Sequence, residues 1–323
     1  MDMPVTTPAA DPRALEALHK RLITVINSAS GGANADSEAE AKAVFEAAGL
    51  PHAQVICVPA AEIDQALTHA VANADVLVVL GGDGTIRSAA AKSGGGAHYL
   101  IPLPGGTMNM LPKALYGQRP WRGALADTLA NPQSHEVSGG KVGQHAFFVA
   151  ALLGAPTLWA DAREALREVH LVEATQRAIT AARRSLSEPL SYAFGDTLSG
   201  SAEAVVLVCP LISKVMNEDE RGLEAAAVDT LTAGEALRLG FHALFDDWRG
   251  DPSVKRAKVK TATVIGHGRV PVIVDGERFR MGRKVEIQFT PLAFRALIPA
   301  GDLEASTPTR AAPASEERLA PPG

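Results

Sequence analysis

Val76-Leu-Val-Val-Leu80, followed at once by Gly81-Gly82-Asp83-Gly84-Thr85, is the stretch that decides the fold of this 323-residue chain. An unbroken apolar run is typical of a central strand in a parallel sheet, because such a strand is covered on both faces. Glycines behind it let the backbone turn sharply into the helix predicted over residues 86–92. Exposed N–H groups and the start of that helix attract phosphate. The stretch predicts an α/β sheet with a phosphate-binding turn.

A plainer interpretation of this turn is a tight strand-to-helix connection in which Asp83 only caps the helix. Two further glycine-rich turns weigh against it. Asn27-Ser-Ala-Ser30-Gly31-Gly32 follows a predicted strand over 22–26, and Pro104-Gly-Gly106-Thr107-Met108-Asn109 follows one over 98–103. The carboxyl ends of neighbouring parallel strands meet at one crevice, where open α/β sheets bind ligands. Three such turns favour a ligand-binding site over the plainer interpretation, in which the glycines serve only to shape each turn.

The remainder of the first half alternates short aliphatic runs with alanine-rich, helix-periodic stretches. This alternation is typical of parallel strands joined by crossover helices. The predicted strands are 22–26, 54–58, 76–80 and 98–103, and the predicted helices are 37–48, 62–73, 86–92 and 121–129. We expect an α/β domain with a parallel sheet over residues 14–132.

After Pro132 the pattern changes to strand-like runs separated by turn signals. The predicted strands are 146–153, 204–208, 258–265, 270–274, 285–289 and 294–298, and helical patterns cover 161–185 and 235–248. We expect a β-rich second domain over residues 133–300. Residues 301–323 are polar and proline-rich and bury too little apolar surface to offset their ordering entropy, so we expect a disordered tail.

Composition excludes several classes of protein. The chain is 46% hydrophobic and 21% charged, which is too mixed for a disordered polymer. Its 36 acidic and 31 basic side chains give a net charge of −5, which disfavours nucleic-acid binding. Cys57 and Cys209 lie far apart in apolar stretches, so we expect buried thiols in a reducing compartment rather than a disulfide. The nine histidines have no zinc-ligand spacing.

The sequence contains no evident membrane-spanning segment and no evident secretory signal. The longest uncharged apolar stretch, 146–160, is broken by Gly154 and Pro156 and falls short of the ~20 residues of a spanning helix. The N-terminus has no charged start before an apolar core, which argues against a secretory signal. We expect a cytoplasmic protein, with peripheral contact at the inner membrane left open.

Four motifs in this order resemble the diacylglycerol kinase catalytic-domain family of lipid kinases, which includes bacterial diacylglycerol kinases, sphingosine kinases and ceramide kinases. The family's Asn-Pro-x-Ser-Gly loop corresponds to residues 27–31, and its Gly-Gly-Asp-Gly-Thr is matched in full at 81–85. Its Pro-x-Gly-Thr-x-Asn loop is matched at 104–109, and Asp-Gly-Glu at 275–277. The similarity covers residues 22–299.

The resemblance implies a nucleotide-binding α/β domain followed by a β-sandwich, with ATP, Mg²⁺ and a lipid meeting in the cleft between them. It implies that Asp83, with Mg²⁺, organises the triphosphate and that Glu277 accepts the proton of the lipid hydroxyl. Taken alone, Asp275-Gly276 before Glu277 also fits an ordinary hairpin turn. The nucleotide-binding residues that the resemblance implies are Asn27, Ser30, Gly31, Gly81, Gly82, Asp83, Gly84, Thr85, Gly106, Thr107 and Asn109.

The chain departs from the family pattern at several positions. Arg87 and Ser88 stand where Asn and Glu usually follow the glycine turn, and Pro59 replaces a Thr that commonly contacts the nucleotide. Arg221 occupies the position of an Asp that binds a structural Mg²⁺ in bacterial members. Asp219 and Glu220 are candidate substitutes as metal ligands, but a solvated acidic loop is the favoured interpretation.

The resemblance implies an ATP-dependent lipid kinase acting on a hydroxyl of diacylglycerol or a related lipid. One alternative is a soluble-substrate enzyme like NAD kinases, which share the glycine turn; another is a nucleotide-binding regulator without turnover. Basic side chains suit either contact with anionic lipid headgroups or a plain solvated surface: Arg177, Arg183, Arg184, Lys255, Arg256, Lys258 and Lys260. Trp159, Leu166 and Leu171 suit either an acyl pocket or core packing. The oligomeric state is left open.

Overall fold

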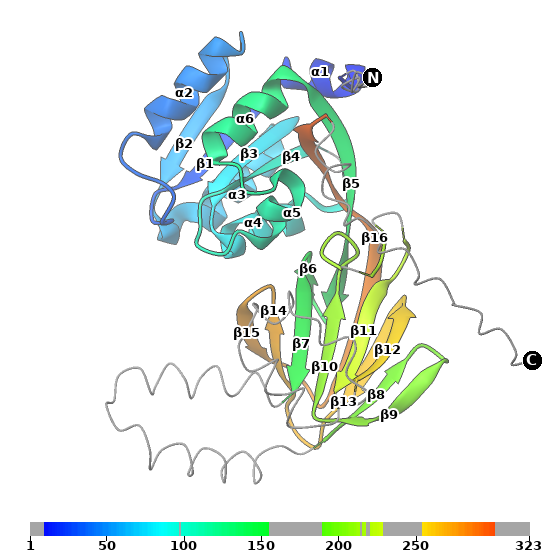
Figure 1. Ribbon diagram of the computed structural model, residues 1–323. Coiled ribbons are helices and arrows are strands. Elements are labelled where there is room, and N and C mark those ends of the chain that lie inside the picture. Colours follow the sequence, from blue (N-terminus) through cyan, green and yellow to red (C-terminus); the bar gives the residue numbers. More distant parts are fainter. Residues whose placement is uncertain are drawn as a thin grey trace, which may run out of the picture.

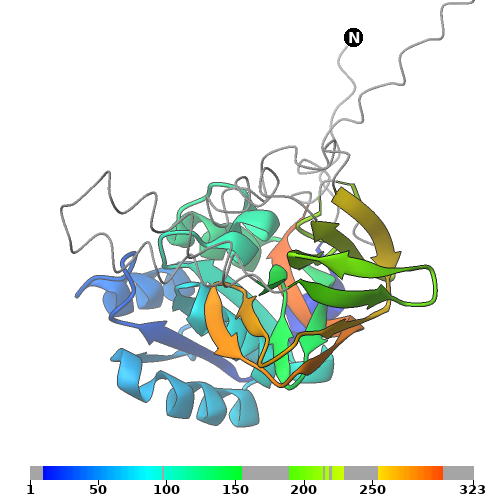
Figure 2. The same cartoon turned by 90° about the horizontal axis from the view of Figure 1, so that it is seen from below.

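The structure is a computed structural model, and it describes residues 10–96, 98–154, 189–213, 215–217, 220–228 and 254–300. Figure 1 shows an α/β part above a part made of strands, with β5 and β16 running from one into the other. Seen from below, the orange β14–β15 hairpin lies in front of the blue and cyan elements of the α/β part (Figure 2). The expected α/β fold with a β-sandwich is confirmed.

The α/β part is built on four parallel strands in the order β2-β1-β3-β4. Their bounds are β1 (Leu22–Asn27), β2 (Gln54–Val58), β3 (Val76–Gly81) and β4 (Tyr99–Pro104). The helices are α1 (Pro12–Leu18), α2 (Ser37–Ala47), α3 (Ile63–Asn73), α4 (Asp83–Lys92), α5 (Met110–Tyr116) and α6 (Trp121–Ala130), with short 3₁₀ turns η1 (Ala60–Glu62) and η2 (Gly94–Gly96). Every residue of β3 is buried, as its apolar sequence requires.

The second part contains two antiparallel arrays of strands. Their bounds are β5 (Pro132–Val142), β6 (His145–Phe147), β7 (Ala150–Gly154), β8 (Leu190–Phe194), β9 (Leu198–Ala202), β10 (Ala204–Val208), β11 (Leu223–Val228), β12 (Val254–Val259), β13 (Thr261–Ile265), β14 (Pro271–Val274), β15 (Glu277–Arg280) and β16 (Lys284–Pro299). One sheet has the order β12-β11-β10-β7-β14-β15, and the other contains β16-β13-β8-β9. Side chains of both sheets share one core, which contains Phe147, Phe194, Leu207 and Ile287.

Strand β16 joins the two parts of the molecule. It pairs in parallel with β4 and antiparallel with β13 and β5, so the α/β sheet continues into the sandwich. The strands predicted over 285–289 and 294–298 are therefore one strand, whose pairing with β5 is irregular between Thr290 and Phe294. The division of the chain into domains at residue 132 stays a prediction, and β16 shows that the C-terminal strand completes the N-terminal sheet.

Two other predicted strands are interrupted in the structure. The run 146–153 is split into β6 and β7, because the backbone N–H groups of Phe148 and Val149 donate to Asp275 instead of to a neighbouring strand. The run 258–265 is split at Lys260 into β12 and β13, which belong to different sheets. Helix α4 begins at Asp83, three positions before its predicted start.

Several expectations need correction or lie outside the described residues. Cys209 is buried as expected, but Cys57 is only half-buried, because it lies on β2 at the edge of the sheet. The predicted helices 161–185 and 235–248 and the predicted tail 301–323 lie outside the described residues. Within the part of the chain that the structure describes, no helix is both long and apolar enough to span a bilayer.

Candidate active site

The three glycine-rich turns meet at the carboxyl edge of the parallel sheet and bind one another directly. The backbone N–H of Gly32 donates to the carbonyl of Gly105 at 2.7 Å, and the N–H of Gly105 donates to the carbonyl of Gly81 at 2.9 Å. The side-chain amide of Asn27 donates to the Thr85 hydroxyl at 3.0 Å. The turns after β1, β3 and β4 therefore form one hydrogen-bonded unit.

Close backbone packing explains several of these glycines. A Cβ atom added to Gly105 would lie 2.8 Å from the Gly81 nitrogen, and one added to Gly106 would lie 2.7 Å from the Gly82 Cα. Contacts this short cannot be relieved by moving a side chain, because the neighbouring atoms belong to the backbone. At Gly31, by contrast, nothing lies within 4 Å of the added atom. The turns thus need glycine for their own assembly, independently of any phosphate.

Asp83 connects helix α4 to helix α5. Its carboxylate accepts hydrogen bonds from the backbone N–H groups of Asn109 at 2.9 Å and Met110 at 2.6 Å. Asn109 has a left-handed backbone, with φ of 50°, and its own side chain accepts from the N–H of Gly106. Since the first N–H groups of a helix lack partners within it, Asp83 caps α5 from outside. The side chain does cap a helix, but the helix is α5 rather than its own.

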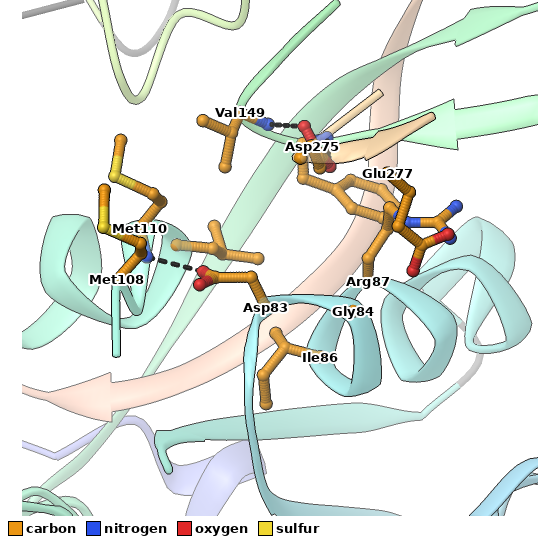
Figure 3. A pocket seen from close by; sticks show the side chains of 12 residues that line it. Asp83, Gly84, Ile86, Arg87, Met108, Met110, Val149, Asp275 and Glu277 are labelled. Carbon is orange, nitrogen blue, oxygen red and sulfur yellow. Dashed lines mark hydrogen bonds and ion pairs between the residues drawn. The ribbon is translucent and has the colours of Figure 1, made fainter. Parts of the chain in front are cut away.

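A cavity of about 240 Å³ opens between α4, the start of α5 and the β14–β15 hairpin. It is lined by Asp83, Gly84, Ile86, Arg87, Met108, Met110, Leu111, Phe148, Val149, Asp275, Gly276 and Glu277. Figure 3 shows Asp83 pointing toward the start of α5, and Glu277 lying beside Arg87. Three carboxylates and a guanidinium, drawn from positions far apart in the sequence, thus surround one space together with apolar side chains.

Asp275 is a buried carboxyl group that sequence reasoning did not assign to the site. It accepts from the backbone N–H groups of Phe148 at 2.8 Å, Val149 at 3.0 Å and Ala150 at 2.9 Å, and its φ is 45°. Burial raises its pKa from 3.8 to about 6, although the three N–H donors oppose that rise. Asp275 therefore fixes the turn that presents Glu277 to the cavity.

Glu277 begins strand β15 and faces helix α4 across the cavity. Its Oε1 would lie 2.8 Å from a Cβ atom added to Gly84, in the first turn of α4. Its Oε2 accepts from the Nη2 of Arg87, which is 190 positions earlier in the sequence. The Glu277 side chain is 43% exposed, so its carboxylate lies at the mouth of the cavity.

The predicted site residues fall into three groups. Asp83, Gly84 and Glu277 line the cavity. Hydrogen bonds or close packing within and between the three turns involve Asn27, Ser30, Gly81, Gly82, Thr85, Gly106 and Asn109. Gly31 and Thr107 are exposed on the same turns. The predicted nucleotide-binding residues are thus gathered at one edge of the sheet, and their roles stay predictions.

The candidate metal site in the second part gains no support from the structure. Asp219 lies outside the described residues, and Glu220 is paired with Lys258. Over the described ranges, no group of three or more His, Cys, Asp or Glu side chains is arranged to hold a metal ion. The roles of Asp219 and Glu220 as metal ligands stay predictions.

The cavity itself fits a magnesium ion that arrives with phosphates. Mg²⁺ in such sites takes one or two carboxylates and completes its shell with substrate phosphates and water. Each oxygen of Asp83 accepts one hydrogen bond and keeps a lone pair for a further partner. Beside it, Gly84 lies in the first turn of the ten-residue helix α4, where partial positive charge favours anions.

The fold and the cavity define a class of protein: a parallel α/β sheet that is completed by an antiparallel sandwich, as in diacylglycerol kinase structures. Residues 21–142 match the family model of the diacylglycerol kinase catalytic domain. This match agrees with the resemblance drawn from the motifs, three of which lie inside the matched segment, and it supports a kinase-like family for the chain. It does not specify the acceptor.

Solved structures agree with the family match. The crystal structure of a diacylglycerol kinase from Bacillus anthracis str. Sterne superposes with a TM-score of 0.62 at 14% identity, covering 86% of this chain and 97% of that chain. A second structure from the same organism gives 0.64 at 16% identity, covering 86% and 97%. At this identity the likeness establishes the fold alone. No curated protein matches the chain in sequence.

Sequence reasoning missed most of the apolar wall of the cavity as well as Asp275. Met108 lies inside a recognised loop and Gly276 inside a recognised motif, so the sequence could have indicated that both residues line the site. Phe148 and Val149 belong to no recognised motif. They line the cavity because they lie in the break between β6 and β7. Arg87 was noticed only as a departure from the family pattern.

Proposed function

We propose that this protein is an ATP-dependent lipid kinase that phosphorylates a hydroxyl group of diacylglycerol or a related lipid. The observation that carries the proposal is the meeting of Asp83 and Glu277, from opposite parts of the molecule, at one cavity. A kinase needs a phosphate-organising group on one side of its acceptor and a proton acceptor on the other. The family match supports the kinase class, and the Asp-Gly-Glu motif supports the lipid acceptor.

The proposed reaction is a direct phosphoryl transfer. The lipid hydroxyl oxygen forms a bond to the γ-phosphorus of ATP, while the bond from that phosphorus to the β–γ bridging oxygen breaks. ADP leaves with the electron pair of the broken bond, and the hydroxyl proton passes to Glu277. Bound Mg²⁺ would supply neutralisation of phosphate charge. The residues proposed to hold it and the phosphates are Asp83 and the first turn of α4.

The apolar wall favours an acceptor that is not fully water-soluble. Met108, Met110, Leu111, Phe148 and Val149 face the same space as the carboxylates. Methionine side chains adapt to irregular apolar groups, as an acyl ester near a hydroxyl would require. A soluble sugar phosphate or dinucleotide would place polar groups against these side chains without hydrogen-bond partners.

The test is a transfer assay with labelled ATP and Mg²⁺, in which diacylglycerol in mixed micelles competes with NAD and fructose 6-phosphate. We expect label in the chloroform-extractable product, and we expect Glu277→Gln to lower the rate by about 10²- to 10⁴-fold, the usual contribution of a general base. Glu286→Gln is the matched control, because Glu286 is exposed on β16 and pairs with Lys284. Label found only in a soluble acceptor would overturn the proposal, and ATP binding without transfer would indicate a regulator.

A further inference from the structure

Arg87 shares a face of helix α4 with the phosphate-organising carboxylate. It lies four positions after Asp83, and side chains at this spacing lie one above the other on a helix. Both side chains line the cavity. Helix α4 therefore presents a carboxylate and a guanidinium, one turn apart, to the same space.

The Arg87 guanidinium is held on several sides. The side chain is only 14% exposed, and its Nε is buried without a hydrogen-bond partner among the described residues. Nη2 donates to Oε2 of Glu277, and the guanidinium carbon lies 5.9 Å from the centre of the Phe279 ring. Phe279 is two positions after Glu277 on β15, so its ring and the Glu277 carboxylate lie on the same side of that strand. Arg87 is thus fixed between them.

Glu277 is the carboxylate that this guanidinium contacts. Both oxygens of Asp83 are engaged by the start of α5, and both oxygens of Asp275 are engaged by the break between β6 and β7. A half-exposed glutamate at the start of an edge strand otherwise has free side-chain rotation. The pairing with a nearly buried, planar guanidinium removes that freedom and directs the carboxylate toward α4.

We propose that Arg87 is a positioning residue: from helix α4 it holds the carboxylate of Glu277 across the gap, in the orientation that receives the acceptor's proton. This inference rests on the proposed function, because it assigns Arg87 to the proton acceptor of that reaction. It gives the departure from the family pattern at residue 87 a defined role. The guanidinium serves the base on the opposite part of the molecule.

The test is a set of kinetic measurements on Arg87→Met, Arg87→Lys, Glu277→Gln and the double variant Arg87→Met/Glu277→Gln, with kcat and the KM for ATP measured separately. The matched control is Arg122→Met. Arg122 also pairs with a glutamate, Glu40, and also lies over an aromatic ring, Trp121 at 4.8 Å, but it is on α6 away from the cavity. Thermal unfolding of every variant shows whether each is folded at the assay temperature.

We expect Arg87→Met to lower kcat by about 10- to 100-fold, the cost of misplacing a catalytic group, with KM for ATP changed less than about threefold. Arg87→Lys should recover part of that loss, because it keeps the charge but loses the planar fork. In the Glu277→Gln background, Arg87→Met should cost less than about twofold, since no base is left to position. Arg122→Met should leave kcat unchanged.

Three results would overturn the inference: an unchanged kcat in Arg87→Met, an equal loss in both backgrounds, or a raised KM for ATP with kcat retained. The second and third would place Arg87 on the phosphates. Failure of the proposed function looks different, because Glu277→Gln would then keep full activity or the wild type would transfer nothing to lipid. The inference falls alone when Glu277→Gln is inactive and Arg87→Met is not.

Discussion

At the scale of single residues, the hairpin before Glu277 depends on one buried carboxyl group. Asp275 is 7% exposed and occupies a left-handed backbone position that few residues other than glycine adopt. Two of its N–H donors, Phe148 and Val149, come from the segment between β6 and β7, and the third, Ala150, is the first residue of β7. Asp275 therefore binds the free N–H groups at a break in the sheet and fixes the turn before β15 at the same time.

Replacing Asp275 by Asn is expected to change how stability depends on pH. The folded-state pKa of about 6 lies above the ordinary value of 3.8, so the folded protein binds this proton more tightly than the unfolded chain. The stabilisation is complete below pH 3.8 and is lost as the pH rises through 6. The wild type's advantage over Asp275→Asn should shrink by about 2–3 kcal/mol between pH 4 and 7.5.

Urea unfolding of both proteins at the two pH values measures this difference. An advantage that grows with pH would mean that the three N–H donors outweigh burial, and that the carboxylate form is the stabilised one. A conserved m-value is the control that both proteins unfold to similar extents.

At the scale of elements, the glycines on the three turns differ in what an added Cβ atom would meet, which is backbone at Gly105 and a side chain at Gly84. Gly105→Ala should lower the free energy of unfolding by about 1–3 kcal/mol, because its Cβ would overlap the Gly81 backbone. Gly84→Ala should change stability much less, because its Cβ meets the end of one side chain, the Glu277 carboxylate, rather than backbone. Gly84→Ala should instead slow phosphoryl transfer.

Denaturant unfolding and the lipid kinase assay, applied to both variants, separate the two effects. Equal destabilisation by the two alanines would contradict the distinction between backbone and side-chain contacts. Full activity in Gly84→Ala would show that Glu277 does not work from the position seen here.

The elements that were predictable from sequence are those whose local pattern agrees with their environment. Strands β1 to β4 are short aliphatic runs buried in a parallel sheet, and all four were expected near their observed bounds. Strand β5 was missed because Pro132-Gln-Ser-His-Glu136 is polar, and its place depends on pairing with β16. The three turns were recognisable, whereas the contacts of Arg87 and Asp275 depend on side chains that meet only after both parts have folded.

At the scale of the whole molecule, β16 makes the two parts one structure. Phe294 lies on this strand, is fully buried and packs edge-to-face on Phe148, with ring centres 5.4 Å apart. Its neighbours belong to the core of the α/β part, while the first half of β16 contributes Val285 and Ile287 to the sandwich core. A single strand therefore contributes buried side chains to the core of the α/β part and to the core of the sandwich.

Phe294→Ala is expected to destabilise both parts together, by about 3–5 kcal/mol for a buried aromatic side chain. Hydrogen exchange measures this directly, and protection should fall in β4 and in β13. Phe45→Ala, on α2 in the α/β part, provides a comparison because Phe45 is equally buried. Loss of protection on one side only in Phe294→Ala would show that the two parts unfold separately.

The paired β5 and β16 have a mechanical consequence for the cavity. From Ile287 opposite Val142 to Pro299 opposite Pro132, the two strands are paired along almost the whole distance between the two parts, and hydrogen-bonded strands resist stretching along their length. The register is broken between Thr290 and Phe294. We expect any widening of the gap between α4 and β15 to bend β16 within this irregular segment.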